Sequence, residues 1–189
     1  MKRAFFLDRD GVINVDVDYL YKPEDVVLCP GVGKAIRKIN EAGYLAVVVS
    51  NQSGIARGMY TLREVKAVER KIRELLEPEN ARLDAFYYCP HYKDGSVPEF
   101  AVECACRKPK PGLLLNAIRD LGIDPSASFL IGDQLSDLRA GEEAGCKAVV
   151  LVTTGQGSRN LEKARAENRI VKPGLPEAVE YLLALYKNS

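Results

Sequence analysis

The sequence has little of several features that mark particular classes of protein. It contains no tryptophan and one histidine, and its 27 basic and 26 acidic side chains leave a net charge of +1. So small a net charge provides no overall attraction to nucleic acid or to an anionic membrane. No apolar run approaches the roughly 20 residues that a membrane helix needs, and the opening stretch MKRAFFLDRDG is too short in its apolar part for a signal peptide. We therefore expect a cytoplasmic monomer with no nucleic-acid partner and no membrane partner.

Cysteine is present but unevenly spread. Three of the five cysteines and the single histidine fall between residues 89 and 106. Such clustering fits metal binding in a reducing compartment better than a disulfide framework. The length of 189 residues suits one globular domain, in which about 89–110 is the one long irregular stretch. We therefore predict a single domain over residues 1–189 with a metal-binding loop at about 89–110.

Apolar runs typical of buried strands alternate with segments of helical spacing. The predicted strands cover residues 3–8, 44–51, 83–90, 126–133 and 147–155. The predicted helices cover residues 31–43, 61–77, 111–122, 135–145 and 175–186. This alternation is typical of βαβ units. It predicts a parallel sheet with helices on both faces, in a doubly wound three-layer α/β/α (Rossmannoid) domain without room for a large cap.

Acidic side chains follow two of the predicted strands at the point where each strand ends. Asp8 and Asp10 follow the first strand, and Asp133 follows the fourth, with Asp137 a turn further on. Because ligands bind outside the carboxyl ends of the strands in such sheets, we expect these acids at one edge. Acids brought together repel each other unless a hard cation lies between them, and oxygen ligands with open positions suit Mg²⁺.

The same edge carries the groups that phosphoryl transfer needs. Asp8 would face the metal as a nucleophile, and Asp10 would serve the leaving oxygen as general acid and then as base. Ser50 and the backbone N–H groups after it would cradle a phosphate. Lys108, or Arg107 beside it, would neutralise charge on the phosphoryl oxygens. Each residue alone is more typical of a turn or a cap, so the order of the set along the chain carries the catalytic interpretation.

The clustered cysteines and the histidine form a possible metal site. Cys89, His91, Cys104 and Cys106 match the Cys₃His set of a closed structural zinc site. A catalytic zinc would need an open position that four protein ligands do not leave. Free cysteines beneath a loop are one alternative, and a zinc knuckle that binds a nucleic-acid backbone is another. The knuckle lacks interleaved aromatic residues and a basic field.

Four stretches carry a family resemblance. FFLDRDGVIN, VVSNQSGIARG, CRKPKPG and LIGDQLSD follow the order of the motifs of the haloacid dehalogenase (HAD) superfamily of aspartyl-phosphate phosphatases. More narrowly, the chain resembles the D-glycero-D-manno-heptose-1,7-bisphosphate 7-phosphatases and the related histidinol-phosphate phosphatase domains, from about residue 3 to about residue 155. The resemblance implies an HAD-like fold with a minimal cap. It also implies Mg²⁺-dependent hydrolysis of the 7-phosphate of a heptose bisphosphate, a small phosphorylated sugar, in nucleotide-activated heptose and lipopolysaccharide biosynthesis.

The resemblance also implies roles for single residues. Asp8 attacks phosphorus, Asp10 protonates the leaving sugar oxygen and then activates water, and Lys108 steadies the nucleophile and the phosphate. Mg²⁺ is held by Asp8, the main-chain carbonyl of Asp10, and Asp133, whereas zinc is structural. The implied substrate contacts are Asp16, Tyr19, Ser50, Asn51, Gln52, Ser53, Arg107, Lys108 and Gln134. Gln134 stands where these enzymes often carry a lysine, which leaves the fine specificity open.

Other interpretations stay open at this point. Within enzymes they are a histidinol-phosphate phosphatase and a polynucleotide 3′-phosphatase, although the near-zero net charge weighs against the latter. In a different class, the chain would be a zinc-dependent binding module without catalysis. For residues 154–160, a plain connection after a strand is the favoured interpretation, and a wall of the pocket is the alternative.

Overall fold

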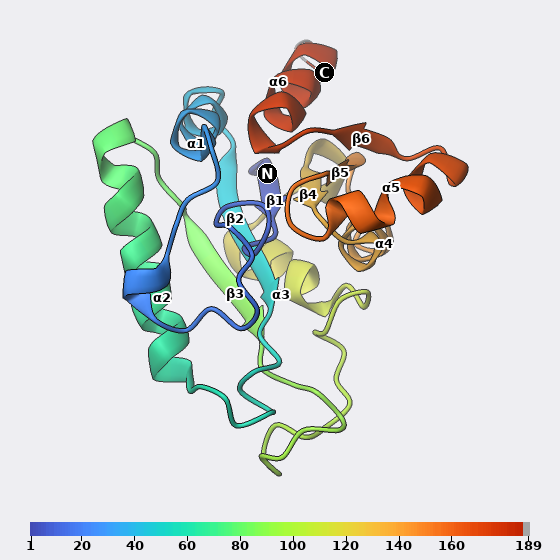
Figure 1. Cartoon of the computed structure of the whole chain (residues 1–189). Coiled ribbons are helices and arrows are strands. Elements are labelled where there is room, and N and C mark those ends of the chain that lie inside the picture. Colours follow the sequence, from blue (N-terminus) through green and yellow to red (C-terminus); the bar gives the residue numbers. More distant parts are fainter. Residues whose placement is uncertain (187–189) are drawn as a thin grey trace.

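One sheet of six strands organises the computed structural model of the protein, which describes residues 1–186 (Figure 1). The strand order across the sheet is β3-β2-β1-β4-β5-β6. The strands are β1 (Ala4–Leu7), β2 (Leu45–Asn51), β3 (Ala85–Cys89), β4 (Phe129–Gly132), β5 (Ala148–Val152) and β6 (Ile170–Lys172). Each neighbouring pair is parallel. Parallel neighbours need crossover connections, so helices are expected on both faces.

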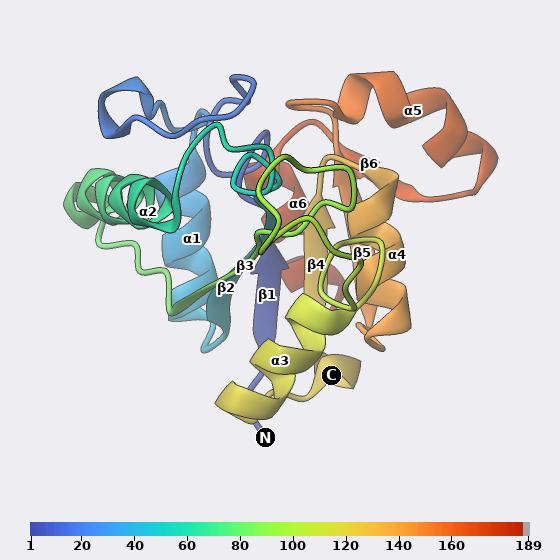
Figure 2. The same cartoon turned by 90° about the horizontal axis from the view of Figure 1, so that it is seen from below.

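Six α-helices supply those connections. They are α1 (Val32–Glu41), α2 (Leu62–Leu76), α3 (Gly112–Leu121), α4 (Leu135–Glu143), α5 (Gly157–Ala166) and α6 (Leu175–Leu185). Three short 3₁₀ helices accompany them: η1 (Pro23–Asp25), η2 (Glu77–Glu79) and η3 (Pro125–Ala127). Most buried apolar side chains of α1, α2 and α6 belong to one core cluster, and those of α3, α4 and α5 belong to another. Figure 2 shows α3 in front of the sheet and α6 behind it, so the predicted three-layer α/β/α fold is confirmed.

The central strand β1 shows why the sheet is covered twice. Phe5 and Leu7 pack into the first core cluster, whereas Ala4 and Phe6 pack into the second. All four side chains are fully buried, which explains why this strand is continuously apolar rather than alternating. A strand so enclosed holds its last residue, and the side chains that follow it, in a fixed position.

The elements predicted from the sequence are present, with ends that differ by a few residues. Helix α5 and strand β6 were not predicted from the sequence. The only buried residues of α5 are Gly157 and Ala164, and β6 has partly buried residues alone. Neither segment therefore carries the apolar periodicity on which a prediction from sequence depends.

The topology brings the predicted site residues to one edge of the sheet. β1 lies between β2 and β4, and the connections that leave its two sides diverge. Ligands bind at this kind of switch point in open α/β sheets. No separate cap domain interrupts residues 1–186, and none of the helices there has the length and apolar character needed to cross a membrane. Residues 187–189 of the predicted single domain lie outside the described part of the chain.

Candidate active site

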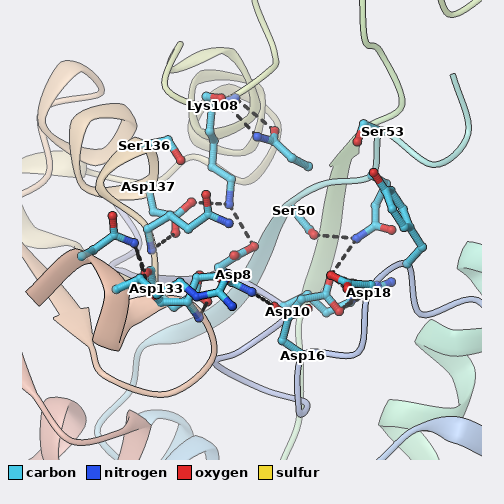
Figure 3. A pocket seen from close by; sticks show the side chains of 18 of the residues that line it. Asp8, Asp10, Asp16, Asp18, Ser50, Ser53, Lys108, Asp133, Ser136 and Asp137 are labelled. Carbon is cyan, nitrogen blue, oxygen red and sulfur yellow. Dashed lines mark hydrogen bonds and ion pairs between the residues drawn. The ribbon is translucent and has the colours of Figure 1, made fainter. Parts of the chain in front are cut away.

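Three buried aspartates meet at the carboxyl ends of β1 and β4. Asp8 directly follows β1 and donates its backbone N–H to the carbonyl of Ile131 in β4, at 3.0 Å. Asp133 directly follows β4, and Asp137 lies in the first turn of α4. One carboxylate oxygen of each lies within 4.8 Å of the others (Figure 3). Two adjacent parallel strands thus place acids far apart in sequence where they could hold a metal ion.

Two glycines make room for Asp133. Gly11 and Gly155 have φ values of +78° and +55°, and a Cβ atom on either would lie 2.4 or 2.3 Å from Asp133 Oδ2. Only glycine therefore fits these positions without displacing the carboxylate. Asp133 Oδ2 accepts a hydrogen bond of 2.7 Å from the backbone N–H of Gln156. Its Oδ1 is buried and has no hydrogen-bond partner within residues 1–186, so this oxygen is available to a ligand.

A buried lysine balances part of the negative charge. Lys108 Nζ lies 2.9 Å from Asp8 Oδ1 and 2.8 Å from Asp137 Oδ1, and it also donates to the carbonyl of Val49 at 2.8 Å. Its backbone exchanges two hydrogen bonds with the side chain of Asn51, at 3.0 and 3.1 Å. The end of the long loop is thereby fixed to the end of β2.

Burial and crowding shift the protonation of these groups. Burial raises the pKa of Asp8 to about 7, an effect that the Lys108 ammonium opposes and the Asp137 carboxylate reinforces. Burial, followed by the charges of Asp8 and Asp137, raises the pKa of Asp133 to about 8. Burial acts to lower the pKa of Lys108, but the carboxylates of Asp137 and Asp8 outweigh it and raise that pKa above its ordinary value. The lysine is thus charged, and the carboxyl groups compete for protons and cations.

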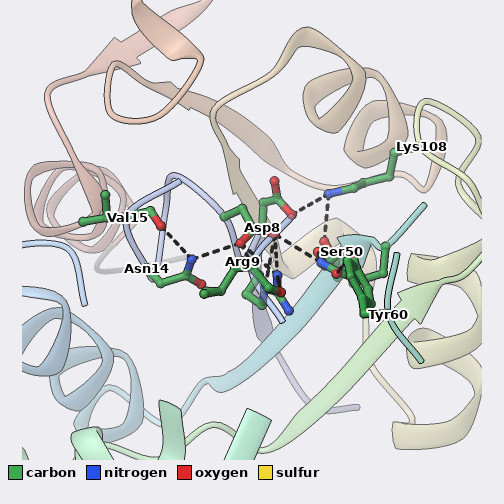
Figure 4. Close-up of polar contacts among 11 residues, drawn as sticks. Asp8, Arg9, Asn14, Val15, Ser50, Tyr60 and Lys108 are labelled. Atoms are coloured by element: carbon green, nitrogen blue, oxygen red, sulfur yellow. Dashed lines mark hydrogen bonds and ion pairs between the residues drawn. The ribbon is translucent and has the colours of Figure 1, made fainter. Parts of the chain in front are cut away.

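Asp10 lies in a different environment from that of Asp8. The Asp10 carboxylate accepts hydrogen bonds from Arg9 Nη2 at 2.9 Å, Asn14 Nδ2 at 2.9 Å and Gln52 Nε2 at 3.1 Å (Figure 4). Its side chain is 26% exposed, whereas that of Asp8 is 10% exposed. Both carboxylates contact a cation, and they differ in exposure, with Asp8 enclosed and Asp10 more open to the cavity.

A tyrosine fixes the amide beside Asp10. The Tyr60 hydroxyl donates to Gln52 Oε1 at 2.7 Å, which leaves Gln52 Nε2 to donate to Ser50 Oγ at 2.8 Å as well as to Asp10. Gln52 is 2% exposed and Tyr60 is 6% exposed. No sequence pattern marked Tyr60, because its contact with Gln52 forms only when the loop after β2 folds back.

We expect the change Tyr60→Phe to lower the free energy of unfolding by about 1–3 kcal/mol. It leaves the buried Gln52 Oε1 without its donor, and an unsatisfied buried acceptor costs about that much. Urea denaturation of the purified variant measures the effect. Tyr21→Phe is the matched control. The Tyr21 ring stacks on that of Tyr60, with 6.0 Å between the ring centroids. This substitution also removes a tyrosine hydroxyl but leaves the bond between Tyr60 and Gln52 in place. Equal stability of both variants would contradict the assignment.

A cavity of about 480 Å³ opens above these groups. The predicted substrate contacts that line it are Asp16, Tyr19, Ser50, Asn51, Gln52, Ser53, Lys108 and Gln134. It is also lined by residues that the sequence analysis did not assign to the substrate: Arg9, Asp18, Tyr60, Ser136, Gln156, Arg159 and Asn160. The last three belong to residues 154–160, so the structure favours the pocket-wall alternative over a plain connection for that segment.

Arg107 lies apart from the other predicted contacts. Its Nη1 donates to the carbonyl of His91 at 3.3 Å, and its guanidinium lies 5.3 Å from the ring centroid of Tyr92. It lines a separate cavity of about 250 Å³ beside the long loop. Arg107 does not line the cavity of about 480 Å³ that contains the other predicted contacts. A contact between Arg107 and the substrate therefore stays a prediction.

The four soft ligands come together in the long loop. Cys89 ends β3 and is fully buried, and one ligand atom each from Cys89, His91, Cys104 and Cys106 lies within 4.8 Å of the rest. The sulfur–sulfur distances are 3.0, 3.3 and 3.5 Å, and the Nδ1 atom of His91 lies 3.4 and 3.7 Å from two sulfurs. A tetrahedral zinc with Zn–S bonds of about 2.3 Å separates its ligands by about 3.8 Å, so the cluster can hold this ion after a small expansion.

The fold and the site together define an HAD-like hydrolase. The family model described as "HAD-hyrolase-like" matches residues 105–178, which include the segment of Lys108 and the Asp133–Asp137 pair. A nucleophile-type aspartate, a buried lysine and two further acids at the switch point of a doubly wound sheet agree with that class. The protein is a phosphoric monoester hydrolase.

The relatives narrow the class. D-glycero-beta-D-manno-heptose-1,7-bisphosphate 7-phosphatase of Haemophilus ducreyi is 42% identical over 96% of this chain and 98% of its own. The Escherichia coli K12 protein of the same name is 44% identical over 81% of this chain and 80% of its own. D,D-heptose 1,7-bisphosphate phosphatase from B. bronchiseptica, solved with magnesium and phosphate, is 35% identical, with a TM-score of 0.85 over 98% of this chain and 99% of that one. The chain belongs to this family of heptose bisphosphate phosphatases.

Proposed function

We propose that the chain is a Mg²⁺-dependent phosphatase that removes the 7-phosphate of D-glycero-D-manno-heptose 1,7-bisphosphate. The relatives at 42% and 44% identity are named for this reaction. The observation that carries the proposal is the contact of 2.9 Å between Lys108 and Asp8 in a cavity lined by the predicted phosphate contacts. We further propose that residues 1–189 act as one domain, with residues 89–110 as its zinc-binding loop.

Asp8 acts as the nucleophile in this proposal. One carboxylate oxygen of Asp8 forms a bond to phosphorus as the bond from phosphorus to the sugar oxygen breaks, and Asp10 gives a proton to that oxygen. The products of this step are the free sugar hydroxyl and an acyl phosphate, the mixed anhydride of the Asp8 carboxyl group with phosphate. Asp10, now a carboxylate, takes a proton from water as the water oxygen attacks phosphorus. Inorganic phosphate leaves, and both carboxyl groups return to their first state.

The end of β2 and the lysine bind the transferred phosphoryl group. Ser50 and Asn51 lie at the carboxyl end of β2, and Lys108 lies beside them, with its backbone bonded to the Asn51 side chain and its Nζ to the carbonyl of Val49. A hydroxyl and an amide provide donors to the phosphoryl oxygens, and the ammonium provides positive charge beside them. The three N–H donors of Lys108 Nζ already face Asp8, Asp137 and the carbonyl of Val49, so Lys108 acts in this proposal through its charge or by transferring the donor now held by Asp8.

The acidic cluster fits a magnesium ion. Asp8 and Asp133 offer carboxylate oxygens, one of them the unpartnered buried Oδ1 of Asp133, and the main-chain carbonyl of Asp10 is the third ligand inferred from the sequence. Asp137 is the further carboxylate that the structure adds to this cluster. When bound, Mg²⁺ would neutralise charge on the phosphoryl group and lower the repulsion between the acids.

Stabilisation by Mg²⁺ should grow with pH. The pKa values of Asp8 and Asp133 are raised from 3.8 to about 7 and about 8 in the folded protein. The stability that these groups contribute is therefore fully present below 3.8 and is lost as the pH rises through about 7 and about 8. Mg²⁺ competes with protons for these carboxylates, so it restores the most stability at high pH, where the carboxyl groups have lost their protons. At about 100 times its Kd it adds about 2.7 kcal/mol, or roughly 5–11 °C in Tm.

Thermal melts at a pH of about 6 and about 8.5, with and without Mg²⁺, measure this difference. The control variant Asp133→Asn should show little Mg²⁺-dependent shift at either pH. A shift in the wild-type protein that is equal at both values, or larger at the lower one, would contradict the metal assignment.

A panel of phosphate esters tests the substrate. We expect phosphate release to be fastest from heptose 1,7-bisphosphate, measured for each anomer, and far slower from histidinol phosphate and from a 3′-phosphorylated oligonucleotide. A pocket built for a sugar with two phosphates cannot bind these other groups equally well. Comparable rates on all substrates would mean that the proposed specificity is wrong.

A further inference from the structure

The proposed substrate carries two phosphates, of which one reacts, and the cavity has one basic side chain left for the other. The basic residues that line it are Arg9, Lys108 and Arg159. Arg9 is 3% exposed and binds the Asp10 carboxylate, and Lys108 is 4% exposed and binds Asp8 and Asp137. Both are already committed to the reacting centre.

Arg159 is available where the other two are not. It lies in the first turn of α5, is exposed, and makes no ion pair with a carboxylate within residues 1–186. Its Nη1 donates to Gln156 Oε1 at 2.8 Å. A guanidinium has five N–H donors in a planar fork, so most of them remain for a phosphate, which such a fork binds in a bidentate manner.

The turn that carries Arg159 is tied to the reacting centre at two points. The backbone N–H of Gln156 donates to Asp133 Oδ2 at 2.7 Å, and Asn160 Nδ2 donates to the carbonyl of Asp133 at 3.3 Å. The Gln156 side chain donates in turn to Asp16 Oδ2 at 2.7 Å, on the far side of the same cavity. Arg159 is thereby held at a set position relative to the site where phosphate reacts.

The charge of the cavity makes such a cation necessary. Six aspartates line it, Asp8, Asp10, Asp16, Asp18, Asp133 and Asp137, against three basic residues. A second phosphate that entered beside Asp16 and Asp18 would meet negative charge unless an unpaired cation accompanied it. Resting on the proposed function, we propose that Arg159, oriented by Gln156, binds the phosphate that is not hydrolysed and so makes the enzyme selective for a bisphosphate over a monophosphate.

The test compares Arg159→Ala with the wild-type enzyme on heptose 1,7-bisphosphate and on heptose 7-phosphate, the same sugar without the second phosphate. We expect kcat/KM for the bisphosphate to fall by roughly 10- to 100-fold, mainly through KM, as loss of a charge-assisted contact predicts. The value for the monophosphate should change by less than about twofold. Arg159→Lys should recover part of the loss, since it keeps the charge but not the fork.

Arg165→Ala is the matched control, because Arg165 is an exposed arginine of the same helix outside the cavity lining. It should match the wild type on both substrates. An Arg159→Ala variant that loses activity equally on both substrates, or loses less than about twofold on the bisphosphate, would overturn this proposal alone. A wild-type enzyme inactive on the bisphosphate would instead overturn the proposed function, and this proposal with it.

Discussion

Replacing Asp8 with asparagine should reduce kcat by on the order of 10⁴- to 10⁶-fold, the loss seen when an enzyme's nucleophile is removed. The amide has nearly the shape of the carboxylate but cannot form a stable bond to phosphorus. The variant should remain folded. Lys108 keeps its contact of 2.8 Å with Asp137, and one of three mutually repelling acids becomes neutral. Because burial and neighbouring acids raise the pKa of Asp8 to about 7, its Tm at a pH of about 8.5 should equal or exceed that of the wild type.

Phosphate release measures the first effect, and a thermal melt of the same preparation measures the second. Asp94→Asn is the control, because Asp94 is an exposed acid of the long loop that contributes nothing to the cavity. It should retain wild-type kcat and Tm. Measurable turnover by the Asp8→Asn variant, at more than about one-hundredth of the wild-type rate, would remove Asp8 from the nucleophile role.

We expect the change Cys104→Ser to prevent the proposed zinc binding and to loosen the loop that carries Lys108. Cys89 and Cys104 are 15 residues apart, and closing a loop of that length contributes about 3 kcal/mol in the chain-entropy model. Loss of that constraint should lower Tm by roughly 6–12 °C. It should also lower kcat/KM, because the proposed zinc ligand Cys106 lies two residues before Lys108, whose backbone bonds to Asn51.

Metal analysis of the purified protein should find about one zinc per chain, and little in the Cys104→Ser variant. Because the thiols must lose their protons to bind the metal, zinc should also be lost on acidification. Cys146→Ser is the control, since Cys146 lies outside the four-ligand cluster, and it should retain zinc. A Cys104→Ser protein that stays metal-free yet keeps wild-type Tm would contradict a structural zinc.

The placement of the acids at the candidate site could be predicted, because it follows from strand ends. Asp8 and Asp133 each follow a buried strand directly, and parallel neighbours bring such ends together. The clustering of the four soft side chains could be predicted equally well, since the chain has one histidine and three of its cysteines lie near it in sequence. In both cases the chemistry of the residue type and its place in the chain carried the information.

The wall of the cavity could not be predicted in the same way. Gln156 caps and Arg159 belongs to a polar helix whose buried residues are Gly157 and Ala164, so no periodicity marked it. Tyr60 depends on the fold of the loop after β2, and Arg107 turns toward His91 although it adjoins Lys108. Tertiary contacts decide the direction in which a loop side chain points, and local sequence patterns do not predict those contacts.

The central claim is that the phosphoryl group is transferred first to the Asp8 carboxylate and then to water. Its most direct test is the stereochemistry at phosphorus, measured with a substrate whose transferred phosphorothioate group is made chiral with oxygen isotopes. Each in-line displacement inverts the configuration, so attack by Asp8 followed by attack by water predicts net retention. Net inversion would mean that water attacks the substrate directly, and the aspartyl-phosphate mechanism would be wrong.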